Sequence, residues 1–115
     1  MGKPHTVIEL TEENVMALKG KVDFALFSAG AGTSAKFAPV FVEAGAVVVD
    51  NSNQWRMYDD VPLVVPDGNH VDVKLNKGLI SNPTCPTIQD AASPQPPYHP
   101  PGLTPKYHST HQPLP

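Results

Sequence analysis

The sequence predicts an α/β fold built around a mostly parallel sheet. Short apolar runs at residues 23–27 and 46–50 have the pattern of strands that are buried on both faces, and a third apolar run lies at residues 61–65. A segment with helical apolar spacing separates the first two runs. Because a strand, a helix and a second strand in succession form a right-handed crossover, we expect these runs to share one parallel sheet.

The first elements expected are a strand at residues 6–10 and a short helix. Thr11 is a suitable N-cap for that helix, and the two glutamates that follow it favour the positive end of the helix dipole. Gly20 is a suitable C-terminal stop because glycine adopts the left-handed conformation without strain. The strand at residues 23–27 follows, and small residues at 28–33 indicate a loop.

The central helix is expected at residues 34–44. Its apolar residues recur at helical spacing, and Pro39 inside the segment predicts a kink or a late start. After the strand at residues 46–50, the apolar run at residues 61–65 contains Pro62, which favours a sheet edge or a first strand position. These residues form the apolar face of the helix: Phe37, Val40, Phe41 and Ala44.

The last ordered elements are a turn, a strand and a helix. Residues 67–69 have turn composition, residues 79–81 form the short strand, and a helix is expected over residues 86–92. Residues 93–115 contain more than half of the 14 prolines and few large aliphatic residues. We therefore expect one domain over residues 1–92 and a Pro-rich disordered tail over residues 93–115.

The composition excludes several functions. The chain has 115 residues and a net charge of −3, without the basic runs that nucleic-acid binding needs. It has no apolar stretch of the ~20 residues that span a membrane and no secretory signal, so we expect a cytoplasmic protein. The five histidines show no metal-ligand spacing, and no metal is expected.

Loops that follow the predicted strands contain the residues that could carry chemistry. In parallel sheets, ligands bind beyond the carboxyl ends of the strands, where residues 28–30, 51–52 and 82–85 should meet. Cys85, the only cysteine, lies at the entry to a helix, where the dipole favours a nucleophilic thiolate. The alternative is a small buried apolar residue.

Four segments, at residues 23–30, 48–57, 60–66 and 81–89, resemble the aspartate-semialdehyde dehydrogenase family in order and spacing. The resemblance covers roughly residues 2–90. It implies a partial Rossmann-like, NADP-binding domain. Members of that family begin with a strand and a glycine-rich turn and continue into a second domain that holds a catalytic histidine. We expect this chain to lack these parts.

The resemblance also implies the roles of individual residues. Cys85 matches the catalytic nucleophile, and Arg56 and Asn82 match residues that bind the substrate or its phosphate. The matching cofactor-binding residues are Ser28, Ala29, Gly30, Ser34 and Asn51. From the residues alone, a tight turn at 28–30, a turn-forming Asn51 and a surface Arg56 remain alternatives. Thr84 departs from the family, which usually has asparagine before the cysteine.

We interpret the chain as a truncated aspartate-semialdehyde dehydrogenase that is inactive on its own. The family reduces aspartyl phosphate with NADPH in amino-acid biosynthesis, acts on a small-molecule substrate and is typically homo-oligomeric. Two alternatives remain open. One is a fragment of an N-acetylglutamyl-phosphate reductase. The other is a non-enzymatic Pro-rich module, since residues 94–97 and 97–100 satisfy the loose PxxP pattern.

Overall fold

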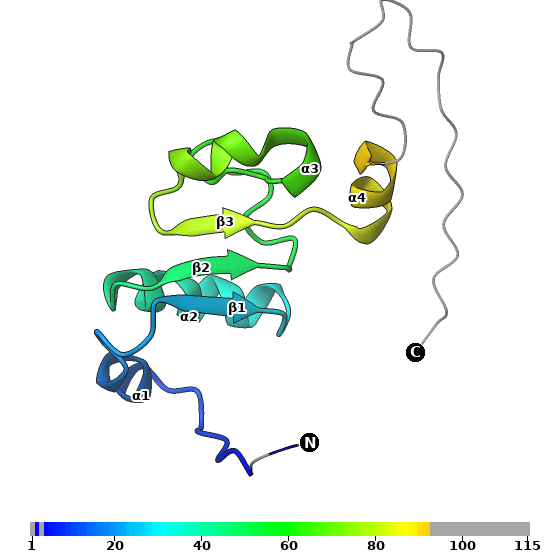
Figure 1. The fold of residues 1–115 in the computed structure, drawn as a ribbon. Coiled ribbons are helices and arrows are strands. Elements are labelled where there is room, and N and C mark those ends of the chain that lie inside the picture. Colours follow the sequence, from blue (N-terminus) through cyan, green and yellow to red (C-terminus); the bar gives the residue numbers. More distant parts are fainter. Residues whose placement is uncertain (1, 3, 93–115) are drawn as a thin grey trace, which may run out of the picture.

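The structure is a computed structural model that describes residues 2 and 4–92. Three parallel strands form one sheet in the order β1-β2-β3, as Figure 1 shows, which confirms the predicted α/β class. The elements in chain order are α1 (Glu12–Ala17), β1 (Phe24–Phe27), α2 (Ala31–Glu43), β2 (Val47–Asp50), α3 (Pro66–Asn69), the 3-10 helix η1 (His70–Leu75), β3 (Leu79–Ser81) and α4 (Cys85–Ala92).

The N-terminal helix forms as predicted, but the strand before it does not. Thr11 is the N-cap of α1, and its hydroxyl accepts a hydrogen bond from the Asn14 amide at 3.3 Å. Residues 6–10 have no regular secondary structure because no described strand pairs with them. Asn14 instead donates its side-chain amide to the Glu9 carbonyl at 2.9 Å. The predicted strand at residues 6–10 was therefore wrong.

Helix α2 begins three residues earlier than predicted. Gly30 is its N-cap with a φ of 85°, a conformation that favours glycine, and the Ser34 amide donates to the Gly30 carbonyl at 3.1 Å. The predicted loop at residues 28–33 is therefore shorter. Pro39 lies inside the helix, which continues to Glu43.

The two faces of the sheet differ. Ala25 and Phe27 of β1 are buried in the hydrophobic core that α2 covers, and α2 lies behind β1 and β2 in Figure 1. Phe24 and Leu26 point to the opposite face and are 70% and 84% exposed. No described helix covers that face at β1, so the prediction that β1 is buried on both faces was wrong.

The apolar run at residues 61–65 lies at the edge of the sheet without forming a full strand. Leu63 makes a single parallel bridge with Ser81. The Ser81 amide donates to the Pro62 carbonyl at 2.9 Å, and Val64 donates to the Ser81 carbonyl at 3.0 Å. Pro62 has no amide proton to extend the pairing, so its edge position follows from its chemistry.

The remaining elements include one that was not predicted, the 3-10 helix η1 at residues 70–75. The predicted turn at residues 67–69 is the single-turn helix α3. Strand β3 forms at residues 79–81, and α4 begins at Cys85, one residue before the predicted start. The predicted disordered tail at residues 93–115 lies outside the described residues.

Candidate functional site

The carboxyl ends of the strands bring two asparagines side by side. All three strand arrows in Figure 1 point to the side of the sheet where α4 lies. Beyond the strand ends, the Asn51 amide donates to the Phe27 carbonyl and the Asn82 amide donates to the Asp50 carbonyl, both at 2.8 Å. The parallel hydrogen-bonding pattern therefore continues past the strands and fixes both asparagine backbones. The predicted convergence of strand-end loops is present for these two.

Arg56 connects the same two asparagines. Its Nε donates to the Asn82 carbonyl and its Nη2 to the Asn51 carbonyl, each at 2.9 Å. The Asn82 side-chain amide also donates to Asn51 Oδ1 at 2.8 Å. The structure thus joins three of the predicted site residues in one hydrogen-bonded group: Asn51, Arg56 and Asn82. We call it the anion group, after the kind of ligand that a guanidinium binds.

The contacts of Arg56 determine which part of its guanidinium can bind a ligand. A guanidinium carries five N–H donors in one plane and is permanently charged. The Nε–Nη2 edge is engaged with backbone carbonyls, whereas the described residues provide no partner for Nη1. The Nη1–Nη2 edge can therefore bind two oxygens of a phosphate or carboxylate.

A hydrogen-bonded loop at residues 51–55 places Arg56. Asp50 is fully buried, and its carboxylate accepts hydrogen bonds from the Ser52 amide at 3.2 Å and the Ser52 hydroxyl at 2.5 Å. The Ser52 hydroxyl in turn accepts from the Gln54 amide at 3.2 Å. The indole Nε1 of Trp55 donates to Ser34 Oγ at 2.8 Å. The loop is therefore held near both ends.

Cys85 is the first residue of α4 and has an exposed free thiol. The Thr84 carbonyl accepts from the Ile88 amide at 3.1 Å, and the hydroxyls of Thr84 and Thr87 are hydrogen-bonded at 2.7 Å. The position at a helix entry agrees with the sequence prediction. The alternative that Cys85 is a small buried residue was wrong.

The loop at residues 28–30 fits part of a nucleotide cofactor. Its three residues are exposed and precede the N-terminus of α2, which has 13 residues. The amides of the first three helical residues, 31–33, have no partner within the helix because its first backbone bond comes from Ser34. An exposed helix start with open amides suits an anionic phosphate group.

Ser34 is buried, unlike the exposed loop at residues 28–30, and this does not suit contact with a cofactor. Its side chain is 1% exposed, and its hydroxyl is bonded to Trp55. Among the predicted cofactor-binding residues, Ser28, Ala29 and Gly30 lie at the surface, and Asn51 belongs to the anion group. The structure therefore separates Ser34 from the exposed loop that begins the helix.

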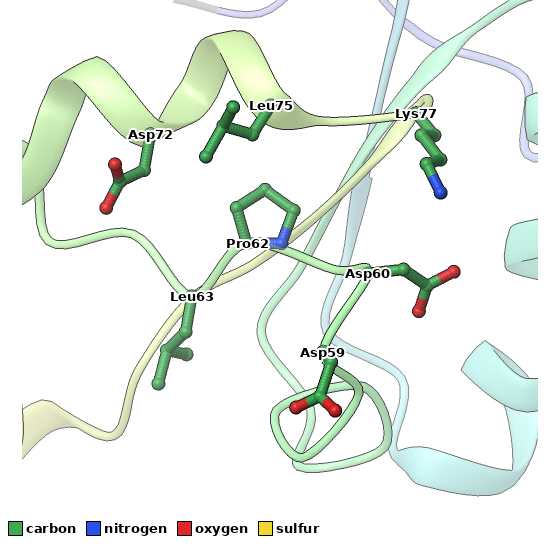
Figure 2. Close-up of a pocket in the computed structure, with 7 residues that line it drawn as sticks. All are labelled: Asp59, Asp60, Pro62, Leu63, Asp72, Leu75 and Lys77. Atoms are coloured by element: carbon green, nitrogen blue, oxygen red, sulfur yellow. The ribbon is translucent and has the colours of Figure 1, made fainter.

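A separate open cleft lies away from these residues. It has a volume of about 430 Å³ and is shown in Figure 2, where Leu75 of η1 lies above Pro62. None of the predicted site residues lines it. Asp72 accepts a hydrogen bond from the Asn69 side chain at 2.8 Å. The cleft is lined by Asp59, Asp60, Pro62, Leu63, Asp72, Leu75 and Lys77.

Two further features concern membranes and metals. Across residues 2 and 4–92, no helix is long and apolar enough to cross a membrane. The same residues contain no group of three or more histidine, cysteine, aspartate or glutamate side chains that could hold a metal ion.

A parallel α/β sheet with an anion group and a thiol beyond its strand ends defines a nucleotide-binding domain of the Rossmann-like class. The family described as "Semialdehyde dehydrogenase, NAD binding domain" matches residues 2–76. The chain therefore belongs to the semialdehyde dehydrogenase family.

Individual relatives agree with this assignment. The chain is 50% identical to an aspartate-semialdehyde dehydrogenase of Aquifex aeolicus over 96% of this chain and 32% of the relative. It is 52% identical to that of Campylobacter jejuni over 76% of this chain and 26% of the relative. The crystal structure of aspartate semialdehyde dehydrogenase II from Vibrio cholerae, complexed with ASA, has a TM-score of 0.58 at 48% identity, over 59% of this chain and 23% of that one.

These alignments define the extent of the resemblance. The chain spans about a third or less of the length of these relatives. The Aquifex aeolicus alignment covers 96% of the chain, so it extends well beyond Asp90 into the Pro-rich segment. The predicted end of the resemblance, at about residue 90, was therefore too early.

Sequence reasoning missed the residues that hold the anion group in place. Asp50, Ser52 and Trp55 received no role, although each makes a hydrogen bond that orders the loop before Arg56. The acidic residue at a strand end, two positions before a serine, is a local turn signal that could have indicated the first contact. The bond between Trp55 and Ser34 joins residues 21 positions apart and has no local signal.

Proposed function

We propose that the chain carries the nucleophile and the phosphate-binding group of an NADP-dependent aspartate-semialdehyde dehydrogenase. The complete enzyme would reduce aspartyl phosphate to aspartate semialdehyde in amino-acid biosynthesis. The observation that supports this most is the anion group, whose Asn82 lies three residues before the exposed Cys85. A nucleophile next to an anion-binding group is what displacement of phosphate from an acyl phosphate requires.

In this mechanism, the Cys85 thiolate attacks the acyl carbon of the substrate. A carbon–sulfur bond forms, the bond between carbon and the phosphate oxygen breaks, and phosphate leaves with the electron pair. Arg56 binds the departing phosphate through its Nη1–Nη2 edge, because the opposite edge is held by two carbonyls. The fixed guanidinium needs little reorganisation when charge develops on the leaving group.

The exposed loop at residues 28–30 and the start of α2 would hold the pyrophosphate end of the cofactor. When bound, the nicotinamide cofactor would supply the hydride that reduces the thioacyl carbon. The carbon–sulfur bond then breaks, which releases the aldehyde and returns Cys85 to its thiolate form. We propose NADP as the cofactor, a cytoplasmic location and a homo-oligomeric complete enzyme, as the resemblance implies.

A chimera tests this proposal. Residues 3–90 would replace the matching segment of the Aquifex aeolicus relative, and NADPH-dependent reduction of aspartyl phosphate would be measured. We expect activity that Cys85→Ser lowers by more than about 1,000-fold, because a hydroxyl lacks the nucleophilicity of a thiolate. Asp67→Ala, on the exposed surface of α3, is the matched control and should leave activity unchanged. An active chimera that is indifferent to Cys85→Ser would contradict the assigned nucleophile.

Two further variants of the chimera separate binding from attack. Arg56→Lys should raise the KM for aspartyl phosphate about tenfold or more, because an ammonium cannot hold two carbonyls and a phosphate in one plane. Thr84→Asn should raise kcat if an amide is needed before the nucleophile, since a hydroxyl cannot supply two donors. An unchanged KM for aspartyl phosphate in Arg56→Lys would exclude Arg56 from binding the phosphate group.

A further inference from the structure

Ser34 makes an unusual contact for a serine inside a helix. It lies in the fourth position of α2, is 1% exposed and accepts a hydrogen bond from Trp55 Nε1 at 2.8 Å. An indole N–H is only a donor, so the Ser34 oxygen must be the acceptor. The contact joins α2 to the loop that follows β2 in the sequence.

Trp55 is attached to Arg56 and is itself fixed from two sides. Its ring packs against the hydrophobic core and lies 5.2 Å from the ring of Tyr58. The hydrogen bond to Ser34 sets the direction of the indole within that packing. Because Trp55 and Arg56 are consecutive, an indole held in place also holds the backbone from which the guanidinium reaches Asn51 and Asn82.

The loop that carries Arg56 is held at its start by Asp50 and at its end by Ser34. Asp50 lies in the strand directly before the loop, so its contact with Ser52 is local. Ser34, in contrast, belongs to a different element from the loop, the helix α2. The Ser34 contact therefore fixes the loop relative to the core rather than only shaping it.

We propose that Ser34 is a positioning residue for the anion group. Its hydroxyl orients Trp55, and Trp55 in turn keeps the Arg56 guanidinium against the two asparagine carbonyls. This role replaces the cofactor contact that the family resemblance implied for Ser34. It deepens the proposed function and rests on it for the identity of the bound anion, phosphate.

The full 115-residue chain allows a direct test because Trp55 is its only tryptophan. In ¹H–¹⁵N spectra, one indole N–H signal reports on the bond to Ser34, and the Arg56 Nε–H signal reports on the bond to Asn82. We expect Ser34→Ala to shift both signals and to speed their hydrogen exchange about fivefold, the loss expected for one neutral hydrogen bond. Thr33→Ala removes a neighbouring hydroxyl from α2 and should leave both signals unchanged.

Titrations distinguish positioning from cofactor binding. Ser34→Ala should weaken binding of inorganic phosphate about fivefold and change NADP affinity less than about twofold. A loss of NADP affinity with an unchanged Arg56 Nε–H signal would overturn the proposal and restore the cofactor role. If the unsubstituted chain binds no phosphate, the proposed function fails, but the Arg56 signal still decides whether Ser34 positions the guanidinium.

A second variant covers the case in which Ser34→Ala does not fold. Trp55→Phe removes the donor and keeps an aromatic ring in the core, so it should speed Arg56 Nε–H exchange to the same extent. Ser34→Ala added to Trp55→Phe should then change that exchange less than about twofold, because the bond is already absent. Equal effects of Ser34→Ala in both backgrounds, or a normal Arg56 signal in Trp55→Phe, would overturn the proposal.

Discussion

The two segments that carry the candidate catalytic groups are held in different ways. Residues 50–56 contain a buried carboxylate, a bonded serine, a fixed indole and a guanidinium that spans two carbonyls. Residues 84–88 contain the start of a helix, an exposed pair of bonded hydroxyls and an exposed thiol. The proposed phosphate-binding side is therefore built into the fold, whereas the proposed nucleophile lies open at the start of a helix.

Substitutions in the two segments should therefore have different effects. Changes in residues 50–56 should lower the free energy of unfolding, because they leave buried polar groups without partners. Changes in residues 84–88 should alter reactivity with little effect on stability, because surface substitutions away from special contacts usually change it by about 0.5 kcal/mol or less. The predictions below test this division.

The largest effect is expected for Asp50→Ala. The fully buried carboxylate accepts two hydrogen bonds from Ser52, and its loss should lower the free energy of unfolding by about 2–3 kcal/mol. Urea denaturation of the 115-residue chain measures this value.

Ser81→Ala is the matched control for Asp50→Ala. Ser81 pairs with Asp50 in register and is equally buried, but its hydroxyl has no partner among the described residues. A larger loss for Ser81→Ala than for Asp50→Ala would contradict this account.

Arg56→Ala should have the next largest effect. Its two bonds to the Asn51 and Asn82 carbonyls join the loop after β2 to the segment after β3, and the side chain is half-buried. Their removal should cost about 1–2 kcal/mol in urea denaturation, because water partly replaces the lost donors. Arg56→Lys should recover less than half of that loss. Full recovery by lysine would show that charge alone, rather than the planar fork, supports the loop.

The fold could largely be predicted from local patterns. Apolar runs separated by a helical segment identified β1, α2, β2 and β3, because these elements are set by periodicity and by parallel crossovers. Residues 6–10 have the same strand-like composition, but none of the described strands pairs with them. The exposure of Phe24 and Leu26 was missed for a related reason, since an apolar run does not reveal whether both sheet faces are covered.

The sequence predicted where the candidate site lies but not the hydrogen bonds that join its residues. Strand-end reasoning placed Asn51 and Asn82 at one edge of the sheet, and the structure adds the Arg56 bonds that join them. The contact between Ser34 and Trp55 depends on how α2 packs against the loop, which no short motif encodes. Tertiary hydrogen bonds of this kind determine how rigid a site is, and sequence patterns do not report them.

Thr87→Ala should have only a small effect on stability. Its hydroxyl is bonded to that of Thr84 at 2.7 Å, but both side chains are exposed and water can replace either partner. We expect a loss of less than about 0.5 kcal/mol in urea denaturation. A loss as large as that of Arg56→Ala would mean that the start of α4 is as firmly held as the loop after β2, and the contrast between the two segments would fail.

The smallest effect on stability is expected at Cys85 itself. Its thiol is exposed at the first position of α4, so Cys85→Ala removes no buried contact and should change the free energy of unfolding by less than about 0.5 kcal/mol. The same exposure predicts that a thiol reagent modifies the folded chain to completion without denaturant. A rate that rises more than about tenfold in urea would show that the fold shields the thiol, since protection of a buried cysteine is lost on unfolding. Slow modification together with a large stability loss in Cys85→Ala would make Cys85 a structural residue and remove the nucleophile from the proposed mechanism.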